Sequence, residues 1–130
     1  MVISKPGSLL VSLMEIEEQN FDPSNFTFKA TYKLKFYNKN LLLRKRIKYP
    51  SICINNNGKM LECPLSDLNG EEIDAINIPA KKSEIIRATV KEANPPFTDI
   101  GEFTYNLTYY QRGSKKPVKV LISLNKHNSR

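Results

Sequence analysis

Residues 26–38 read FTFKATYKLKFYN, and this stretch decides the fold class. Its even positions as far as Phe36 are apolar, whereas its odd positions from Thr27 to Lys35 are threonine or lysine. Successive side chains of a β-strand point to opposite faces, so the alternation predicts a strand with one buried face and one face in water. A helix would scatter the same apolar residues around its circumference. The side chains expected inside are Phe26, Phe28, Ala30, Tyr32, Leu34 and Phe36.

The same period of two recurs near the other end of the chain. Apolar and polar residues alternate over residues 103–109 and again over residues 118–124, and the sequence Gln111-Arg112-Gly113-Ser114 separates the two runs. Glycine and serine are frequent in turns, so these two runs are predicted to form an antiparallel hairpin.

Weaker signals of the same kind fill the middle of the chain. Asn57-Gly58 lies between two runs that contain apolar residues, and Asn-Gly is a strong signal for a two-residue hairpin turn. Strands are expected at residues 49–55, 59–64, 75–78 and 84–91. Residues 8–17 fit the apolar stripe of a helix as well as a strand. We favour a strand there because every later element is β.

The two cysteines, Cys53 and Cys63, flank the predicted Asn-Gly turn. A two-residue turn pairs Cys53 with Glu62 and Cys63 with Ile52, so the two thiols point to opposite faces, and a disulfide would require another register or a bulge. Secreted domains that depend on disulfides usually carry more of them, so we expect reduced thiols. Two cysteines and one histidine are also too few for the four ligands of a structural zinc site, and no metal is expected.

Seven or eight short strands, each with one apolar and one wet face, predict an all-β fold, an antiparallel two-sheet sandwich. A chain of 130 residues suffices for one domain, which we expect to span residues 1–130. No apolar run approaches the roughly 20 residues that cross a bilayer. The first residues, MVISKPGSLLVSLMEIEE, contain no small-residue cleavage site, so neither a transmembrane helix nor a signal peptide is predicted.

Four motifs suggest a class of domain: Phe36-Tyr37-Asn38 at a strand end, Ile-x-Ile before the Asn-Gly turn, Ile78-Pro79-Ala80-Lys81-Lys82-Ser83, and Gly101-Glu102-Phe103-Thr104-Tyr105. In this order the chain resembles bacterial immunoglobulin-like and fibronectin type III-like sandwiches. The resemblance implies a sandwich that acts as a binding, spacer or assembly module, and it carries no functional residues over. Because the immunoglobulin hallmark of a core tryptophan over a disulfide is absent, the fibronectin-like branch is favoured.

The sequence offers little for catalysis. Histidine is the commonest acid–base residue, and the one histidine here is His127, in the polar C-terminal tail. The sequence contains no nucleophile elbow, no glycine-rich phosphate loop and no His/Cys cluster. The acidic stretch 67–74 fails as an EF-hand because its glycine falls at the fourth position instead of the sixth. Carboxylate pairs that meet only in the folded chain leave no local signature. We expect a non-enzymatic protein without a cofactor.

Charge is the most distinctive feature of this chain. The net charge is +7, and residues 29–48 hold eight basic residues and no acidic one, as residues 112–130 hold six and none. If the two stretches meet in the fold, they form a positive surface that attracts nucleic acid, anionic lipid or an acidic partner. The nucleic-acid hypothesis uses Arg44, Lys45, Arg46, Lys48, Lys115 and Lys116. The plainer interpretation is that outward lysines such as Lys29, Lys33 and Lys35 keep a sheet soluble and discourage edge pairing.

The sequence LLLRKRIK at residues 41–48 is the best candidate for a partner contact, because three leucines adjoin a basic run without strand alternation. The candidate residues are Leu41, Leu42, Arg44, Lys45, Arg46 and Lys48, with Tyr37 on the predicted wet face. The alternative is an irregular strand in which Leu41 and Leu43 are buried. The expected function is an interaction or accessory module that binds another macromolecule, with a protein as the favoured partner, through loops or a free sheet edge.

Overall fold

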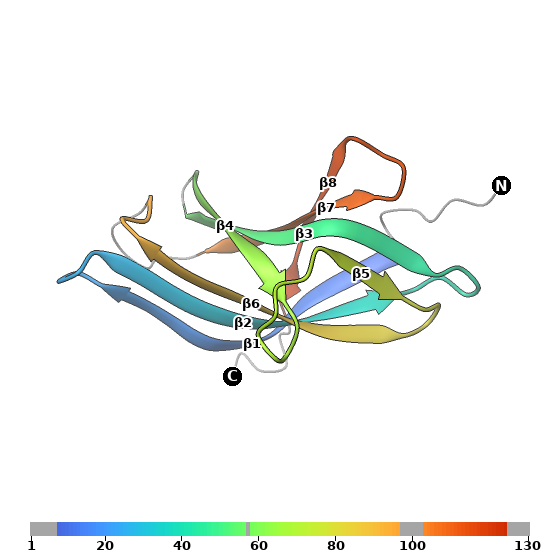
Figure 1. Cartoon of the computed structure of the whole chain (residues 1–130), viewed down its shortest axis with the longest axis horizontal. Helices are drawn as coiled ribbons and strands as arrows, with labels where there is room; N and C mark the ends of the chain where they lie inside the picture. The colour runs from blue at the N-terminus through green and yellow to red at the C-terminus, as the bar shows by residue number, and fades with distance from the viewer. Residues whose placement is uncertain (1–7, 57, 97–102, 125–130) are drawn as a thin grey trace.

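The computed structural model describes residues 8–56, 58–96 and 103–124. This part of the chain is built of β-strands and connecting turns (Figure 1). The strands are β1 (Leu9–Asp22), β2 (Thr27–Asn38), β3 (Lys45–Asn56), β4 (Lys59–Ser66), β5 (Ala75–Ile78), β6 (Ser83–Ala93), β7 (Thr104–Gln111), β8 (Pro117–Leu121) and β9 (Ser123–Leu124).

All nine strands belong to one sheet, in the order β8-β7-β3-β4-β6-β2-β1-β9, with β5 paired to β3 beside this path. The pairs are antiparallel except for the short β1/β9 pair. The sheet curls through 200° into a half-barrel. Its concave side holds the core, and its convex side faces water.

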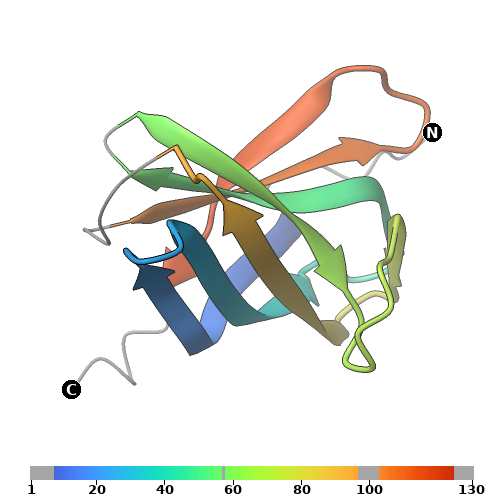
Figure 2. The ribbon, with the colours of Figure 1, turned by 60° about the vertical axis from the view of Figure 1, so that its left-hand side comes forward.

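The prediction of a two-sheet sandwich was wrong, although the prediction of an all-β antiparallel fold was right. The decisive strand is β4. Its residues from Lys59 to Pro64 pair with β3, whereas Leu65 and Ser66 pair with Ala88 and Arg87 of β6. Strand β4 therefore carries the hydrogen-bonded sheet around the bend between the two layers that Figure 2 shows. The resemblance to immunoglobulin-like and fibronectin type III-like sandwiches was therefore also wrong.

The last two described strands lie at opposite edges of the sheet. Strand β8 pairs with β7 at one edge, and β9 pairs with β1 at the other edge through Ser12 and Leu13. One residue, the buried Ile122, separates β8 from β9 in sequence, and its backbone N–H donates to the carbonyl of Tyr105 at 2.9 Å. The chain thus crosses from one edge of the half-barrel to the other at this point.

The alternation that opened the sequence analysis is confirmed in β2. Its inward side chains are fully buried, and they are Phe28, Ala30, Tyr32, Leu34 and Phe36. Phe26 precedes the strand in the β1–β2 turn, with a φ of 50°, and its ring packs edge-on against Phe21 at 5.4 Å. The strand prediction for residues 8–17 is also confirmed, and β1 continues to Asp22. Two register shifts in β1, between Leu13 and Glu15 and between Ile16 and Glu18, explain why its alternation was unclear.

The Asn-Gly hairpin has the predicted register, with Cys53 opposite Glu62 and Cys63 opposite Ile52. Cys63 is buried and Cys53 is partly exposed, as expected of side chains on opposite faces. The start of β3 differs from the prediction. Residues Lys45–Lys48, expected to be irregular, form a strand because they pair with the whole of β5. The hairpin of β7 and β8 is present as predicted.

Candidate functional site

The β2–β3 loop, residues 39–44, presents two leucines to water. Leu41 is 71% exposed and Leu42 is 91% exposed, whereas Leu43 is partly buried. The alternative in which Leu41 is buried in an irregular strand is therefore wrong. A side chain as exposed as that of Leu42 contacts very little of its own protein, so it is available to a partner.

Asn38 holds this loop in one conformation. Its side chain is fully buried, and its Nδ2 donates to the carbonyl of Leu43 and to the carbonyl of Ile78, both at 2.9 Å. Its Oδ1 accepts from the backbone N–H of Asn40 at 3.0 Å. The backbone N–H of Lys39 donates to the carbonyl of Ser8 at 2.8 Å. A loop fixed at several points loses little conformational freedom when it binds.

The β5–β6 turn lies against the same loop. The backbone N–H of Lys81 donates to the carbonyl of Asn38, and the N–H of Asn38 donates to the carbonyl of Lys82, both at 3.0 Å. Both lysine side chains are exposed, and Lys81 has a φ of 60°. No sequence pattern marked these two lysines as site residues. The available signal was Pro79, which marked a turn that two consecutive lysines follow.

The first residues of β3 alternate between the core and the surface. Arg46 and Lys48 are exposed, and the Arg44 guanidinium just before the strand donates to Asn77 Oδ1 at 3.4 Å. Lys45 points inward and is only 1% exposed, and this burial lowers its pKa. Its ammonium group is therefore not placed to bind a partner at the surface, unlike the charged groups of the other basic candidates.

The structure brings the two basic stretches together. Ile47 pairs with Gln111 and Lys48 with Tyr110, so the β7–β8 turn extends beyond the first part of β3. This turn carries three exposed cations, Arg112, Lys115 and Lys116. In Figures 1 and 2 the β2–β3 loop, the β5–β6 turn and the β7–β8 turn all lie toward one end of the molecule. We call this surface the basic end: Lys39, Leu41, Leu42, Arg44, Arg46, Lys48, Lys81, Lys82, Arg112, Lys115 and Lys116.

Two aromatic side chains border the basic end on the β7 side. Tyr49 is 64% exposed, and its ring packs edge-on against Tyr110 at a centroid distance of 6.2 Å. Tyr49 lies at a register shift between β3 and β7 and has a φ of 52°. Tyr37 is partly buried on the convex face, where it pairs with Leu10 and Ser83.

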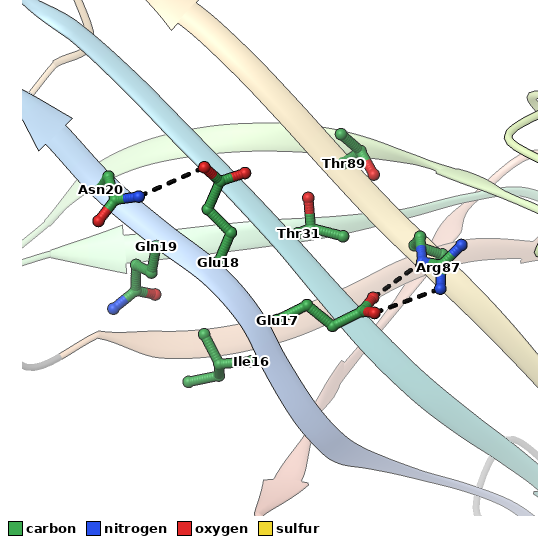
Figure 3. Close-up of a pocket in the computed structure, with 8 residues that line it drawn as sticks. All are labelled: Ile16, Glu17, Glu18, Gln19, Asn20, Thr31, Arg87 and Thr89. Carbon is green, nitrogen blue, oxygen red and sulfur yellow. Dashed lines mark hydrogen bonds and ion pairs between the residues drawn. The ribbon is translucent and has the colours of Figure 1, made fainter.

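The lysines of β2, which are Lys29, Lys33 and Lys35, lie elsewhere, on the outward face of the sheet. On the convex face Lys33 is flanked by Glu15 of β1 and Arg87 of β6. Arg87 forms an ion pair with Glu17, from Nε to Oε1 at 2.8 Å and from Nη2 to Oε2 at 3.3 Å (Figure 3). This pairing lowers the pKa of Glu17 and raises that of Arg87. The lysines of β2 therefore lie on a face of mixed charge.

A shallow depression of about 910 Å³ surrounds this ion pair (Figure 3). Glu17 is held by Arg87, and Glu18 accepts from Asn20 Nδ2 at 3.3 Å. Gln19 points away into the core, where its Oε1 accepts from the hydroxyls of Tyr32 and Tyr105 at 2.6 and 3.1 Å. The carboxylates here are thus occupied by neighbouring groups, and no group of metal-ligating side chains occurs among the described residues.

The thiols are in environments that suppress reactivity. Burial raises the pKa of Cys63 to about 12 and also raises that of Cys53. A thiolate is the reactive form, so neither cysteine has the character of a nucleophile at neutral pH. His127 lies outside the described residues.

Comparison with known proteins gives information about the fold only. No family model and no curated protein matches the chain. The X-ray structure of the structural genomics target SoR45 is similar over 90% of this chain and 83% of that chain, with 18% identity and a TM-score of 0.54. A FixG-related protein from Vibrio parahaemolyticus matches over 91% and 97%, with 12% identity and a TM-score of 0.49. The sporulation control protein Spo0M from Bacillus subtilis matches over 91% and 49%, with 10% identity and a TM-score of 0.42. The likeness to SoR45 supports the half-barrel fold.

The part of the chain that the structure describes contains no helix whose length and hydropathy would suit a membrane crossing.

Proposed function

We propose that the protein is a non-enzymatic interaction module that docks on a partner through its basic end. The observation that carries this proposal is the exposure of Leu41 and Leu42 on a loop that Asn38 holds in place. Fully burying a leucine side chain contributes about 1.5–3 kcal/mol. Two such side chains on a fixed loop therefore supply a useful part of a binding free energy. A protein partner is the expectation from the sequence and stays a prediction.

The test is affinity capture with three forms of the chain. The variant Arg44→Glu/Arg46→Glu reverses two charges of the basic end. The matched control Lys29→Glu/Lys59→Glu makes the same change in net charge at exposed lysines outside it. We expect the first variant to lose the partners that the wild type and the control retain. Retention of every detectable partner by the first variant would contradict the proposal.

The meeting of the two basic stretches favours nucleic acid as a second candidate partner. Arg44, Arg46 and Lys48 approach the turn that carries Lys115 and Lys116, so that their charges combine in one positive surface.

A further inference from the structure

We propose that the basic end docks on an anionic lipid bilayer, with Leu41 and Leu42 inserted beneath the headgroups and the surrounding cations at headgroup level. This inference rests on the proposed function, because it names the partner of the same surface. It follows from the shape of the loop, from the arrangement of charge around it and from the way the loop is held.

The shape of the loop suits a fluid surface. Leu41 and Leu42 are exposed on a loop that projects at one end of the half-barrel (Figure 1). A projecting pair of leucines requires a matching pocket in a protein partner. A bilayer requires no such pocket, because its acyl region accepts apolar side chains wherever they enter.

The cations of the basic end come from the leucine loop itself and from the segments next to it. Lys39 and Arg44 lie in the same loop, and Arg46 follows in β3. Lys81 and Lys82 come from the turn that is hydrogen-bonded to Asn38, the residue just before the loop. Long basic side chains reach the headgroup level while an apolar neighbour lies deeper, and each cation near an anionic leaflet adds to the attraction. Acidic residues concentrate on β1 and in the β4–β5 loop. Two acidic residues lie near the basic end: Glu84 at the start of β6, and Asp74, whose carbonyl accepts from the N–H of Tyr49.

This arrangement fits nucleic acid less well. A phosphate backbone is bound by cations along a track, with aromatic side chains stacked on bases. Here two leucines stand between the cations and would face the phosphates without any gain from burial. The aromatic pair Tyr49–Tyr110 lies toward β7, away from the leucines.

The anchoring of the loop keeps the leucines outward in water. Asn38 binds the carbonyls of Leu43 and Ile78, so the loop is tied both to its own end and to β5. The leucines are therefore already exposed before the protein contacts lipid, and the loop loses little conformational entropy on binding.

The first experiment is sedimentation with vesicles of phosphatidylcholine alone or mixed with phosphatidylserine. The variants are Leu41→Ser/Leu42→Ser and a matched control, Leu68→Ser/Leu121→Ser, which removes two exposed leucines outside the basic end. We expect the wild type to bind the anionic vesicles in preference to the neutral ones. We expect the first variant to bind them on the order of a hundredfold more weakly, and the control to stay within about twofold of the wild type.

The second experiment uses the absence of tryptophan from the sequence. In Leu42→Trp the new indole is the sole tryptophan, and its emission should shift to shorter wavelength when anionic vesicles are added. Leu121→Trp serves as the control and should show no shift. The second experiment remains informative if the double-serine variant fails to fold.

Binding to anionic vesicles without a shift at position 42 would overturn insertion, because the attraction would then be electrostatic only. No binding to anionic vesicles, together with protein capture that Arg44→Glu/Arg46→Glu abolishes, would overturn the lipid assignment and leave the proposed function standing. Tight binding to duplex DNA in place of vesicles would also overturn it. If the protein bound neither anionic vesicles, nor a protein partner, nor duplex DNA, the proposed function itself would be contradicted.

Discussion

Asn38 is the residue on which the geometry of the basic end depends. One side-chain amide satisfies the carbonyls of Leu43 and Ile78, while its oxygen accepts from the N–H of Asn40. At the end of the β2 alternation, an asparagine in the sequence looks like an ordinary loop residue. Its partners Leu43 and Ile78 lie in separate segments, so the local sequence pattern does not indicate its role.

Replacing Asn38 by alanine should destabilise the protein by about 2–4 kcal/mol, because buried backbone carbonyls lose their donor. Urea unfolding would measure this change. The matched substitution Asn40→Ala removes a partly exposed neighbour and should cost clearly less. Equal costs for both substitutions would show that Asn38 has no special part in holding the loop.

At the scale of elements, local alternation predicted most strands because each strand has one dry and one wet face. The start of β3 does not follow this rule. An inward Lys45 interrupts the apolar pattern, and the strand exists there because β5 pairs with it. The sequence also placed Leu41, Leu42, Arg44, Arg46 and Lys48 in one candidate surface. It missed Lys81 and Lys82, which reach that surface only through backbone hydrogen bonds to Asn38.

Arg87 connects three elements, and this connection leads to a prediction. Its guanidinium pairs with Glu17 of β1 across β2, and its Nη1 donates to the carbonyl of Leu68 in the β4–β5 loop at 3.1 Å. Glu17→Gln removes the ion pair and leaves the bond to Leu68 possible, so its melting temperature should change little. Arg87→Ala removes both contacts and should lower the melting temperature further.

Hydrogen exchange would locate the effect of these two substitutions. Faster exchange in residues 67–74 is expected in Arg87→Ala and not in Glu17→Gln. Equal exchange in the two variants would mean that the contact to Leu68 does not order the loop.

At the scale of the whole molecule, the error about the fold has a simple physical origin. Strands in a two-sheet sandwich and in a half-barrel both bury one face, so their sequences alternate in the same way. The two folds differ in whether hydrogen bonding continues between the layers. Here that depends on Leu65 and Ser66 of β4, which pair with residues of β6 that lie far along the chain. No local pattern encodes such a pairing.

Charge also separates over the whole molecule, and the nucleic-acid candidate makes a prediction at this scale. If phosphates bind the basic end, fluorescence anisotropy with duplex DNA should show affinity that falls steeply from about 50 to 200 mM salt. Lys115→Glu/Lys116→Glu should flatten this slope, whereas Lys29→Glu/Lys59→Glu should change it less. Binding no tighter than that of an unrelated basic protein would remove this candidate.

The crossing at Ile122 has a consequence for synthesis on the ribosome. Strand β1 is synthesised before the other described strands, whereas β9, which pairs with its outer edge, is synthesised after them. Until then Ser12 and Leu13 have no pairing partner on the outer side of β1, and an unpaired strand edge is a template for pairing with other chains. Chaperone engagement of this protein should therefore persist until residue 124 is free of the tunnel. Released chains that end before Ile122 should aggregate more readily than released chains that extend beyond Leu124.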